Sequence, residues 1–168
     1  MLLRHAKAAP PEPGQGDAER PLTPRGRRDA AAVGTWVAEH VGRPDLVLCS
    51  PAVRTRQTWS CAASALAAAA AAPVLTPGEV RLSPAVYEAW PDTLLELVRA
   101  VPDDRRTVVL VGHAPGVPAL AERLNRASGT GPVGDFPTSA LAVLAVEGGW
   151  ADLGPGSSSL VAYVVPRG

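Results

Sequence analysis

The sequence has few of the features that mark secreted, membrane-spanning or nucleic-acid-binding proteins. Its two cysteines, Cys49 and Cys61, form no disulfide framework and no signal peptide is evident, so we expect reduced thiols and a cytoplasmic protein. No apolar run reaches the roughly 18 residues that a membrane span requires. The 16 basic and 16 acidic residues balance, so the chain lacks the basic field with which proteins bind nucleic acids or anionic membranes. We therefore expect neither of these partners.

Aromatic residues are also scarce, at 4% of the chain, whereas hydrophobic residues make up 46%. Any core must therefore be built from Ala, Val and Leu side chains. A length of 168 residues suits one domain, and no internal repeat or long linker divides it. We predict a single domain over residues 1–168.

Turn-forming residues divide the chain into alternating strands and helices. Short apolar runs rich in Val and Leu predict buried strands at Leu2–Arg4, Asp45–Ser50 and Thr107–His113. A helix is predicted after Thr23 as N-cap, with Pro24 at its first position. Further helices are expected over residues 50–72, 92–101 (with Asp92 or Thr93 as N-cap) and 114–126, a short strand and a turn over 74–82, and two late strands over 138–147 and 159–165. This order predicts an α/β fold, a three-layer α/β/α sandwich with a mostly parallel central sheet.

Polar side chains stand at the carboxyl ends of three of these strands. The first strand ends at Arg4 and His5, and the third ends at His113. The second leads through Ser50 into a helix whose first turn carries Arg54. The carboxyl ends of parallel strands share one edge of the sheet, and ligands bind beyond that edge. The sequence therefore predicts one crevice that holds two histidines, at least two arginines and a helix N-terminus.

Such a crevice is suited to a phosphate group. Arginine offers a planar fork of donors, and a helix start adds backbone N–H groups. A neutral imidazole can attack phosphorus and form a phosphohistidine that water later cleaves, while the cationic groups stabilise the transition state. We expect a phosphate or sulfate anion in the pocket. Two histidines without a third ligand at usable spacing argue against zinc, so no metal and no cofactor are expected. Taken alone, each histidine could still be a structural residue that follows a strand.

Four motifs in order and spacing resemble those of the histidine phosphatase superfamily. They are "LLRHAKA", "RPLTPRGRRDA", "DLVLCSPAVRTRQT" and "VLVGHAPGV". The small size, the "RHAKA" form of the first motif and "DAERPLT" are most similar to the compact SixA-type phosphohistidine phosphatases. The resemblance covers Leu2 to about Val146 and implies a phosphoglycerate mutase-like fold and a metal-independent phosphatase.

The resemblance also implies roles for individual residues. It makes His5 the nucleophile, Arg4 and Arg54 the phosphate clamps, and His113 a hydrogen-bond donor to the phosphoryl group. Four further residues are implied to border the substrate, namely Arg20 and Thr23 in "RPLT" and Thr138 or Ser139 before a late strand.

The general acid of the larger family members has a weaker counterpart, Glu88 in "AVYEAW". An exposed loop carboxylate is an equally good reading of Glu88. An alkoxide needs a proton as it leaves, whereas imidazole leaves easily, so a site without a strong acid favours phosphoramidate over phosphoester substrates.

Two departures from the family pattern bear on function. Met1 lies only four residues before His5, so we expect either a short first strand or a start further upstream. The chain also lacks room between Ser50 and Thr107 for the segments that close over sugar phosphates in larger members. An open pocket fits a phosphorylated histidine on a protein, such as a phosphotransfer domain, as the first hypothesis. The alternatives are a phosphomonoesterase for a small phosphorylated metabolite (a sugar, nucleotide or cofactor phosphate) and a phosphate-binding regulatory module without turnover.

Overall fold

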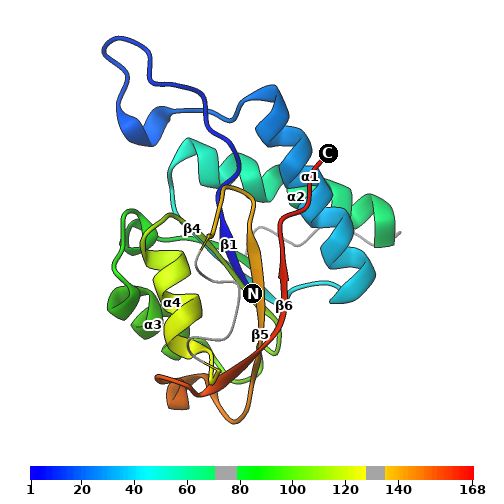
Figure 1. The fold of residues 1–168 in the computed structure, drawn as a ribbon, viewed down its shortest axis with the longest axis vertical. Helices are drawn as coiled ribbons and strands as arrows, with labels where there is room; N and C mark the ends of the chain where they lie inside the picture. Colours follow the sequence, from blue (N-terminus) through cyan, green and yellow to red (C-terminus); the bar gives the residue numbers. More distant parts are fainter. Residues whose placement is uncertain (71–78, 128–134) are drawn as a thin grey trace.

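Strands and helices alternate along the chain in the order that the sequence predicts. The computed structural model describes residues 1–70, 79–127 and 135–168 (Figure 1). The strands are β1 (Leu2–Arg4), β2 (Leu46–Cys49), β3 (Val80–Leu82), β4 (Val108–Gly112), β5 (Leu141–Val146) and β6 (Ser158–Val164), and the helices are α1 (Pro24–His40), α2 (Val53–Ala70), α3 (Pro91–Arg99) and α4 (Gly116–Leu124). Short 3₁₀ turns occupy Asp17–Glu19, Pro84–Val86 and Trp150–Asp152.

The sheet has the strand order β3-β2-β4-β1-β5-β6. Strands β1, β2, β3 and β4 run parallel, and β5 runs antiparallel to both of its neighbours. The prediction of a mostly parallel sheet is therefore confirmed. In the register of the sheet, Arg4 lies beside Gly112 and Cys49 lies beside Val111. The residues that follow these strands consequently meet at one edge.

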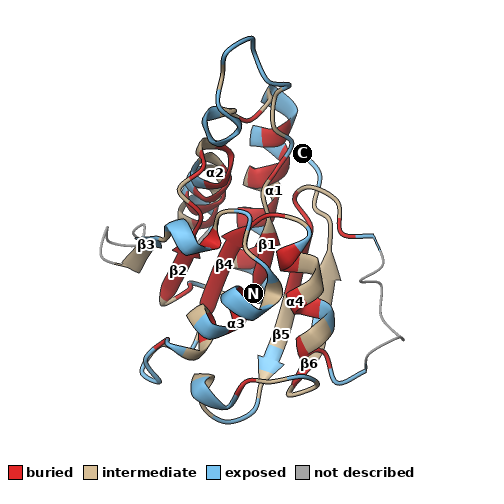
Figure 2. Cartoon of the chain, turned by 90° about the vertical axis from the view of Figure 1, so that its left-hand side faces the viewer, coloured by how far each residue is buried: buried red, intermediate tan, exposed pale blue. Residues whose placement is uncertain are grey.

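Successive side chains of each strand face opposite sides of the sheet, as strand geometry requires. In β2, Leu46 and Leu48 join the core beneath α3 and α4, whereas Val47 and Cys49 join the core beneath α1 and α2. Figures 1 and 2 show these two helix pairs on opposite faces of the sheet. The predicted three-layer α/β/α sandwich is thus confirmed. No helix among the described residues is long and apolar enough to cross a membrane.

Two predicted helix starts have different outcomes. Helix α1 begins at Pro24, and the Thr23 hydroxyl accepts a hydrogen bond from the Gly26 N–H at 3.0 Å, which confirms the predicted cap. The predicted cap of α3, Asp92 or Thr93, is wrong. That helix begins at Pro91 with Trp90 in the N-cap position, because proline is suited to the first helical position, where its missing N–H costs nothing.

The strand expected within residues 74–82 is observed as β3 at Val80–Leu82. Residues 74–78 of that range, and the last residues of the helix expected over 50–72, lie outside the described residues. The late strands agree with the predicted ranges to within a few residues.

Candidate active site

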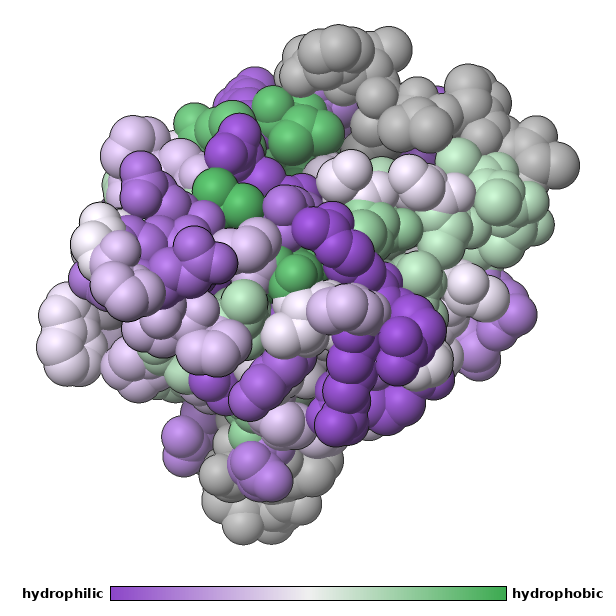
Figure 3. Space-filling model, turned by 90° about the horizontal axis from the view of Figure 1, so that it is seen from above, coloured by the Kyte–Doolittle hydropathy of each residue, from purple (hydrophilic) through white to green (hydrophobic). Residues whose placement is uncertain are grey.

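The parallel strands bring the two predicted histidines together. The backbone N–H of His5 donates to the Gly112 carbonyl at 3.0 Å, and the backbone N–H of Ser50 donates to the Val111 carbonyl at 3.1 Å. As a result, the imidazole centroids of His5 and His113 lie 5.2 Å apart. Seen from above Figure 1, from the end toward which β1 runs, most of the described surface is hydrophilic, with small apolar patches within it (Figure 3).

The ring of His5 has a defined tautomer. Its Nδ1 lies 2.8 Å from the Ala6 carbonyl oxygen, and because a carbonyl can only accept, Nδ1 carries the proton. The Nε2 atom therefore keeps its lone pair. Burial, reinforced by the charges of Arg54, Arg4 and Arg20, lowers the pKa of His5 to about 4. His5 is thus a neutral imidazole at pH 7, with one nitrogen available as a nucleophile.

The ring of His113 is buried and held by one neighbour. Its Nε2 lies 2.8 Å from the Ser50 hydroxyl oxygen, while its Nδ1 is buried without a hydrogen-bond partner among the described residues. Burial, followed by the effects of His5 and Arg54, lowers the pKa of His113 to about 3. Native proteins rarely leave a buried polar atom unpaired without a functional reason.

The two predicted phosphate clamps differ in their surroundings. Arg54 is only 5% exposed, and its guanidinium donates to the Asp17 carbonyl oxygen at 2.6 Å and to Asp17 Oδ2 at 2.7 Å. Arg4 donates through Nη1 to the Phe136 carbonyl at 2.7 Å, and its Nε is buried without a partner among the described residues. Burial lowers the pKa of the Arg4 guanidinium. Both arginines are thus anchored on one side, and each keeps N–H groups that donate to no described residue.

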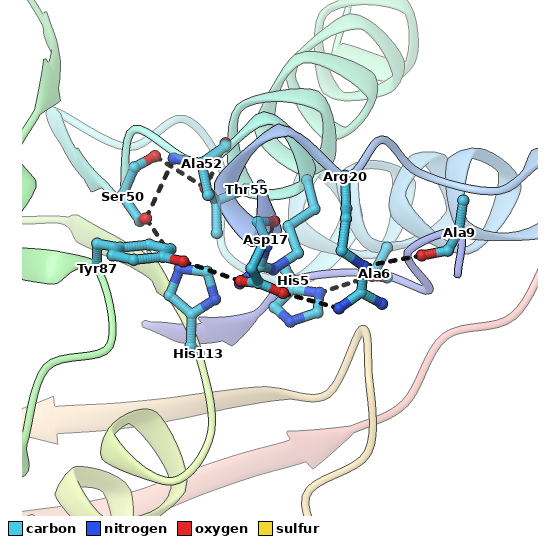
Figure 4. Close-up of polar contacts among 11 residues, drawn as sticks. His5, Ala6, Ala9, Asp17, Arg20, Ser50, Ala52, Thr55, Tyr87 and His113 are labelled. Carbon is cyan, nitrogen blue, oxygen red and sulfur yellow. Dashed lines mark hydrogen bonds and ion pairs between the residues drawn. The ribbon is translucent and has the colours of Figure 1, made fainter. Parts of the chain in front are cut away.

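Asp17 and Tyr87 belong to the same cluster, although they were not among the predicted site residues. The Asp17 carboxylate accepts from Arg20 Nη1 at 2.8 Å, from Arg54 Nη2 at 2.7 Å and from the Tyr87 hydroxyl at 2.9 Å (Figure 4). These donors, Arg20 first, hold the pKa of Asp17 far below its usual range. The Tyr87 ring stands edge-on to His113, with centroids 5.4 Å apart. The "DAER" spacing, with Asp17 three residues before Arg20, was the available sequence signal.

Glu88 follows Tyr87 but is not joined to the cluster. Its side chain is exposed, and no hydrogen bond joins it to another residue that the structure describes. Its backbone has a φ of 50°, a conformation that is uncommon outside glycine. The side chain of this segment that contacts the site is Tyr87.

The four predicted substrate-bordering residues differ in their placement. Arg20 reaches the cluster through Asp17, and its Nε donates to the Ala9 carbonyl. The Thr23 hydroxyl is used for the α1 cap and donates to the Lys7 carbonyl at 3.1 Å. Ser139 is fully buried beside His5, since its backbone N–H donates to the His5 carbonyl at 3.2 Å. Thr138 is half-buried, and its carbonyl accepts from Arg167.

Ser139 has two unusual features for a buried serine. Its φ is 68°, and its hydroxyl has no hydrogen-bond partner among the described residues. Strained backbone and unpaired buried polar atoms both concentrate at functional sites.

The described residues contain no group of three or more His, Cys, Asp or Glu side chains arranged to hold a metal ion. The guanidiniums of Arg54 and Arg4 both act on the two histidines, and guanidiniums stabilise phosphate oxygens by charge-assisted hydrogen bonds. A neutral histidine among arginines, at the carboxyl edge of a parallel sheet, is suited to phosphoryl transfer.

Comparisons with known proteins agree with this class of site. The family model of the histidine phosphatase superfamily (branch 1) matches residues 1–78. An uncharacterized protein of Mycobacterium tuberculosis is 41% identical over 171 residues, which cover 98% of this chain and 100% of the relative. The chain belongs to the histidine phosphatase superfamily, and it is a phosphatase.

Two solved structures are similar over nearly the whole chain. The candidate phosphohistidine phosphatase SixA from Nakamurella multipartitia has a TM-score of 0.82 and 35% identity, with coverage of 98% of this chain and 94% of that one. The corresponding candidate SixA from Agrobacterium tumefaciens has a TM-score of 0.78 and 31% identity, with coverage of 98% and 96%. These similarities support an enzyme over the alternative of a binding module without turnover.

Proposed function

We propose that this phosphatase works through a phosphorylated His5 and acts on phosphohistidine in proteins. The observation that carries the mechanism is the tautomer of His5, whose Nδ1–H is bound to the Ala6 carbonyl so that Nε2 is free to attack. In the first step Nε2 forms a bond to phosphorus as the bond to the leaving group breaks. In the second step water attacks the same phosphorus, which releases phosphate and restores His5.

The surrounding donors would stabilise the charge on the phosphoryl oxygens. Arg54 uses two of its five N–H donors on Asp17, so three remain for the phosphoryl group. The buried Nε–H of Arg4, which has no partner among the described residues, is a further donor for the phosphoryl group. We infer that the Ser50 hydroxyl donates to Nε2 of His113, so that Nδ1 bears the proton and donates to a phosphoryl oxygen. Preorganised donors of this kind stabilise a developing charge without reorganisation.

The choice of phosphohistidine rests on the absence of a suitable acid among the described residues around His5. Asp17 is held as a carboxylate by its three donors, so it cannot supply a proton at neutral pH. Glu88 is exposed and has no hydrogen bond to the cluster. A phosphoester would require such an acid, because an alkoxide leaves poorly. An imidazole leaves without one, and the similarity to SixA-type proteins supports the same substrate class.

The test compares two substrates with the purified protein. One is a phosphotransfer domain phosphorylated on histidine, and the other is p-nitrophenyl phosphate together with a panel of sugar and nucleotide phosphates. We expect a clear preference in kcat/KM for the phosphohistidine domain. A preference for an ester would instead support the small-molecule phosphomonoesterase and return Glu88 as its acid.

A trapping experiment tests the intermediate. Rapid quenching in alkali after mixing with radiolabelled substrate should capture a label that is stable to base and labile to acid. His5→Asn should abolish both the label and the turnover. His40→Asn is the matched control, since His40 is an exposed histidine of α1 whose ring hydrogen-bonds to the Trp36 carbonyl. Turnover that survives in His5→Asn would contradict the mechanism.

A further inference from the structure

We propose that Asp17 determines the choice of leaving group, by accepting a hydrogen bond from the ring N–H of the substrate's phosphorylated imidazole. This inference rests on the proposed function and assigns it a specificity-determining residue. Asp17 belongs to the 3₁₀ turn Asp17–Glu19, between the end of β1 and the start of α1.

The carboxylate of Asp17 has room for one more donor. Among the described residues, Oδ2 accepts from both Arg54 and Tyr87, whereas Oδ1 accepts only from Arg20. An ionised carboxylate offers about four acceptor positions, so one position on Oδ1 is open. The side chain is 44% exposed, and a group on the substrate can therefore reach it.

Asp17 is partly exposed and is linked to the site through its hydrogen-bond partners. Its partner Tyr87 stands edge-on to the ring of His113, and its partner Arg54 lowers the pKa of both His5 and His113 by its charge. Figure 4 shows Asp17 between Tyr87 and Arg20, above the two rings. Attacking and leaving atoms lie roughly in line across phosphorus, so the leaving group departs away from His5, toward the open side of the site.

The fixed charge of Asp17 suits an imidazole and not an alkoxide. Because two guanidiniums and a phenol keep it ionised, Asp17 acts only as an acceptor. A phosphorylated imidazole that is protonated on its second nitrogen presents an N–H to such an acceptor. The departing oxygen of an ester gains negative charge and has no N–H, so the carboxylate repels it.

The bonds and charges of this step balance. The Nε2 lone pair of His5 forms the new P–N bond, and the electron pair of the old P–N bond passes to the ring nitrogen that departs. That ring retains the proton on its second nitrogen, so it leaves as neutral imidazole. Asp17 stabilises the protonated reactant ring and needs no proton transfer of its own.

The experiment measures kcat/KM for N-phosphoimidazole and for p-nitrophenyl phosphate, two small probes that remove protein docking from the comparison. For Asp17→Asn, we expect the ratio of kcat/KM on N-phosphoimidazole to kcat/KM on p-nitrophenyl phosphate to fall by about tenfold to a hundredfold. This is the usual contribution of a hydrogen bond to a charged group. Asp17→Glu keeps the charge, so this ratio should fall less than it does in Asp17→Asn. Glu19→Gln is the matched control, because Glu19 is an exposed carboxylate of the same turn that bonds to Gly16, and its ratio should stay within about twofold of the wild type.

The pH dependence separates this role from a structural one. On N-phosphoimidazole, the alkaline limb of kcat should move to lower pH in Asp17→Asn, since the bound ring loses the negative charge that favours its protonated form. The limb for p-nitrophenyl phosphate should not move. If both substrates lose the same factor and neither limb shifts, Asp17 only holds Arg54 and the inference is wrong. If the wild type does not turn over N-phosphoimidazole in a His5-dependent way, the proposed function itself fails.

Discussion

Thr58 connects the backbone next to the proposed nucleophile, His5, to the proposed phosphate clamp Arg54, and its hydroxyl provides a sharp test of how the site is held. Thr58 and Ala6 are both fully buried. The Thr58 hydroxyl accepts from the Ala6 N–H at 3.0 Å and donates to the Arg54 carbonyl at 2.6 Å. The carbonyl of the same Ala6 fixes the tautomer of His5. Thr58→Val replaces the hydroxyl by a methyl group of similar size and leaves the Ala6 N–H buried without an acceptor.

The expected loss of stability follows from that unpaired N–H. A buried donor left without its partner costs about 1–3 kcal/mol, which corresponds to a fall in Tm of about 2–12 °C for a chain of this size. The backbone of Ala6, whose carbonyl orients the His5 ring, also loses an anchor. Misplacement of a nucleophile by a fraction of an ångström lowers kcat by about tenfold or more.

Urea unfolding gives the stability change, and turnover of a phosphohistidine substrate gives kcat. Thr35→Val is the matched control, because Thr35 is an exposed threonine of α1 whose hydroxyl donates to the Ala31 carbonyl at 3.4 Å. The free energy of unfolding of this variant should differ from that of the wild type by less than about 0.5 kcal/mol. If Thr58→Val behaves like Thr35→Val in both measurements, the hydroxyl does not position the nucleophile and this reasoning is refuted.

Three further predictions concern the reacting groups. Because the pKa of His5 is lowered to about 4, the proposed nucleophile stays neutral as the pH falls through 6.5. The value of kcat/KM, corrected for the ionisation of the substrate itself, should therefore decline only as the pH approaches 4. A His5-dependent break near pH 6.5 would contradict this. His113→Asn should lower kcat by about a hundredfold to a thousandfold, the usual cost of one transition-state donor, while inhibition by inorganic phosphate persists through the arginines; an unchanged kcat would remove His113 from the reaction. Treatment with EDTA should leave turnover unchanged, since Arg4 and Arg54 supply the positive charge, and activity lost to EDTA and restored by a divalent cation would show otherwise.

Sequence reasoning succeeded where chemistry follows directly from neighbouring residues. The N-cap at Thr23 was predictable because a hydroxyl residue before Pro24 satisfies a free N–H of the first turn. The meeting of His5 and His113 was predictable because both follow buried strands, and parallel strands share their carboxyl edge. In both cases a local pattern and one rule of sheet topology were sufficient.

The same reasoning failed where a contact depends on the path of a loop. Asp17 lies 37 residues from Arg54 and 70 from Tyr87 in the chain, and no periodicity relates the three. Glu88 was chosen as the carboxylate of its segment, but the structure directs the preceding side chain, Tyr87, into the cluster. A left-handed backbone at Glu88 accompanies this arrangement, and such a conformation at a non-glycine residue is not readable from sequence.

The electrostatics of the site constrain the substrate. Burial and the guanidiniums favour neutral imidazoles at His5 and His113, which gives a nucleophile but removes both histidines as proton donors at neutral pH. The same guanidiniums keep Asp17 ionised, which removes the carboxyl group that contacts the cluster as a donor. The guanidiniums that would stabilise the phosphoryl charge therefore also keep the nearby groups from donating a proton to the leaving group. A substrate suited to this site must bring its own proton, and a protonated phosphoimidazole does so, because its second ring nitrogen carries the proton throughout the transfer.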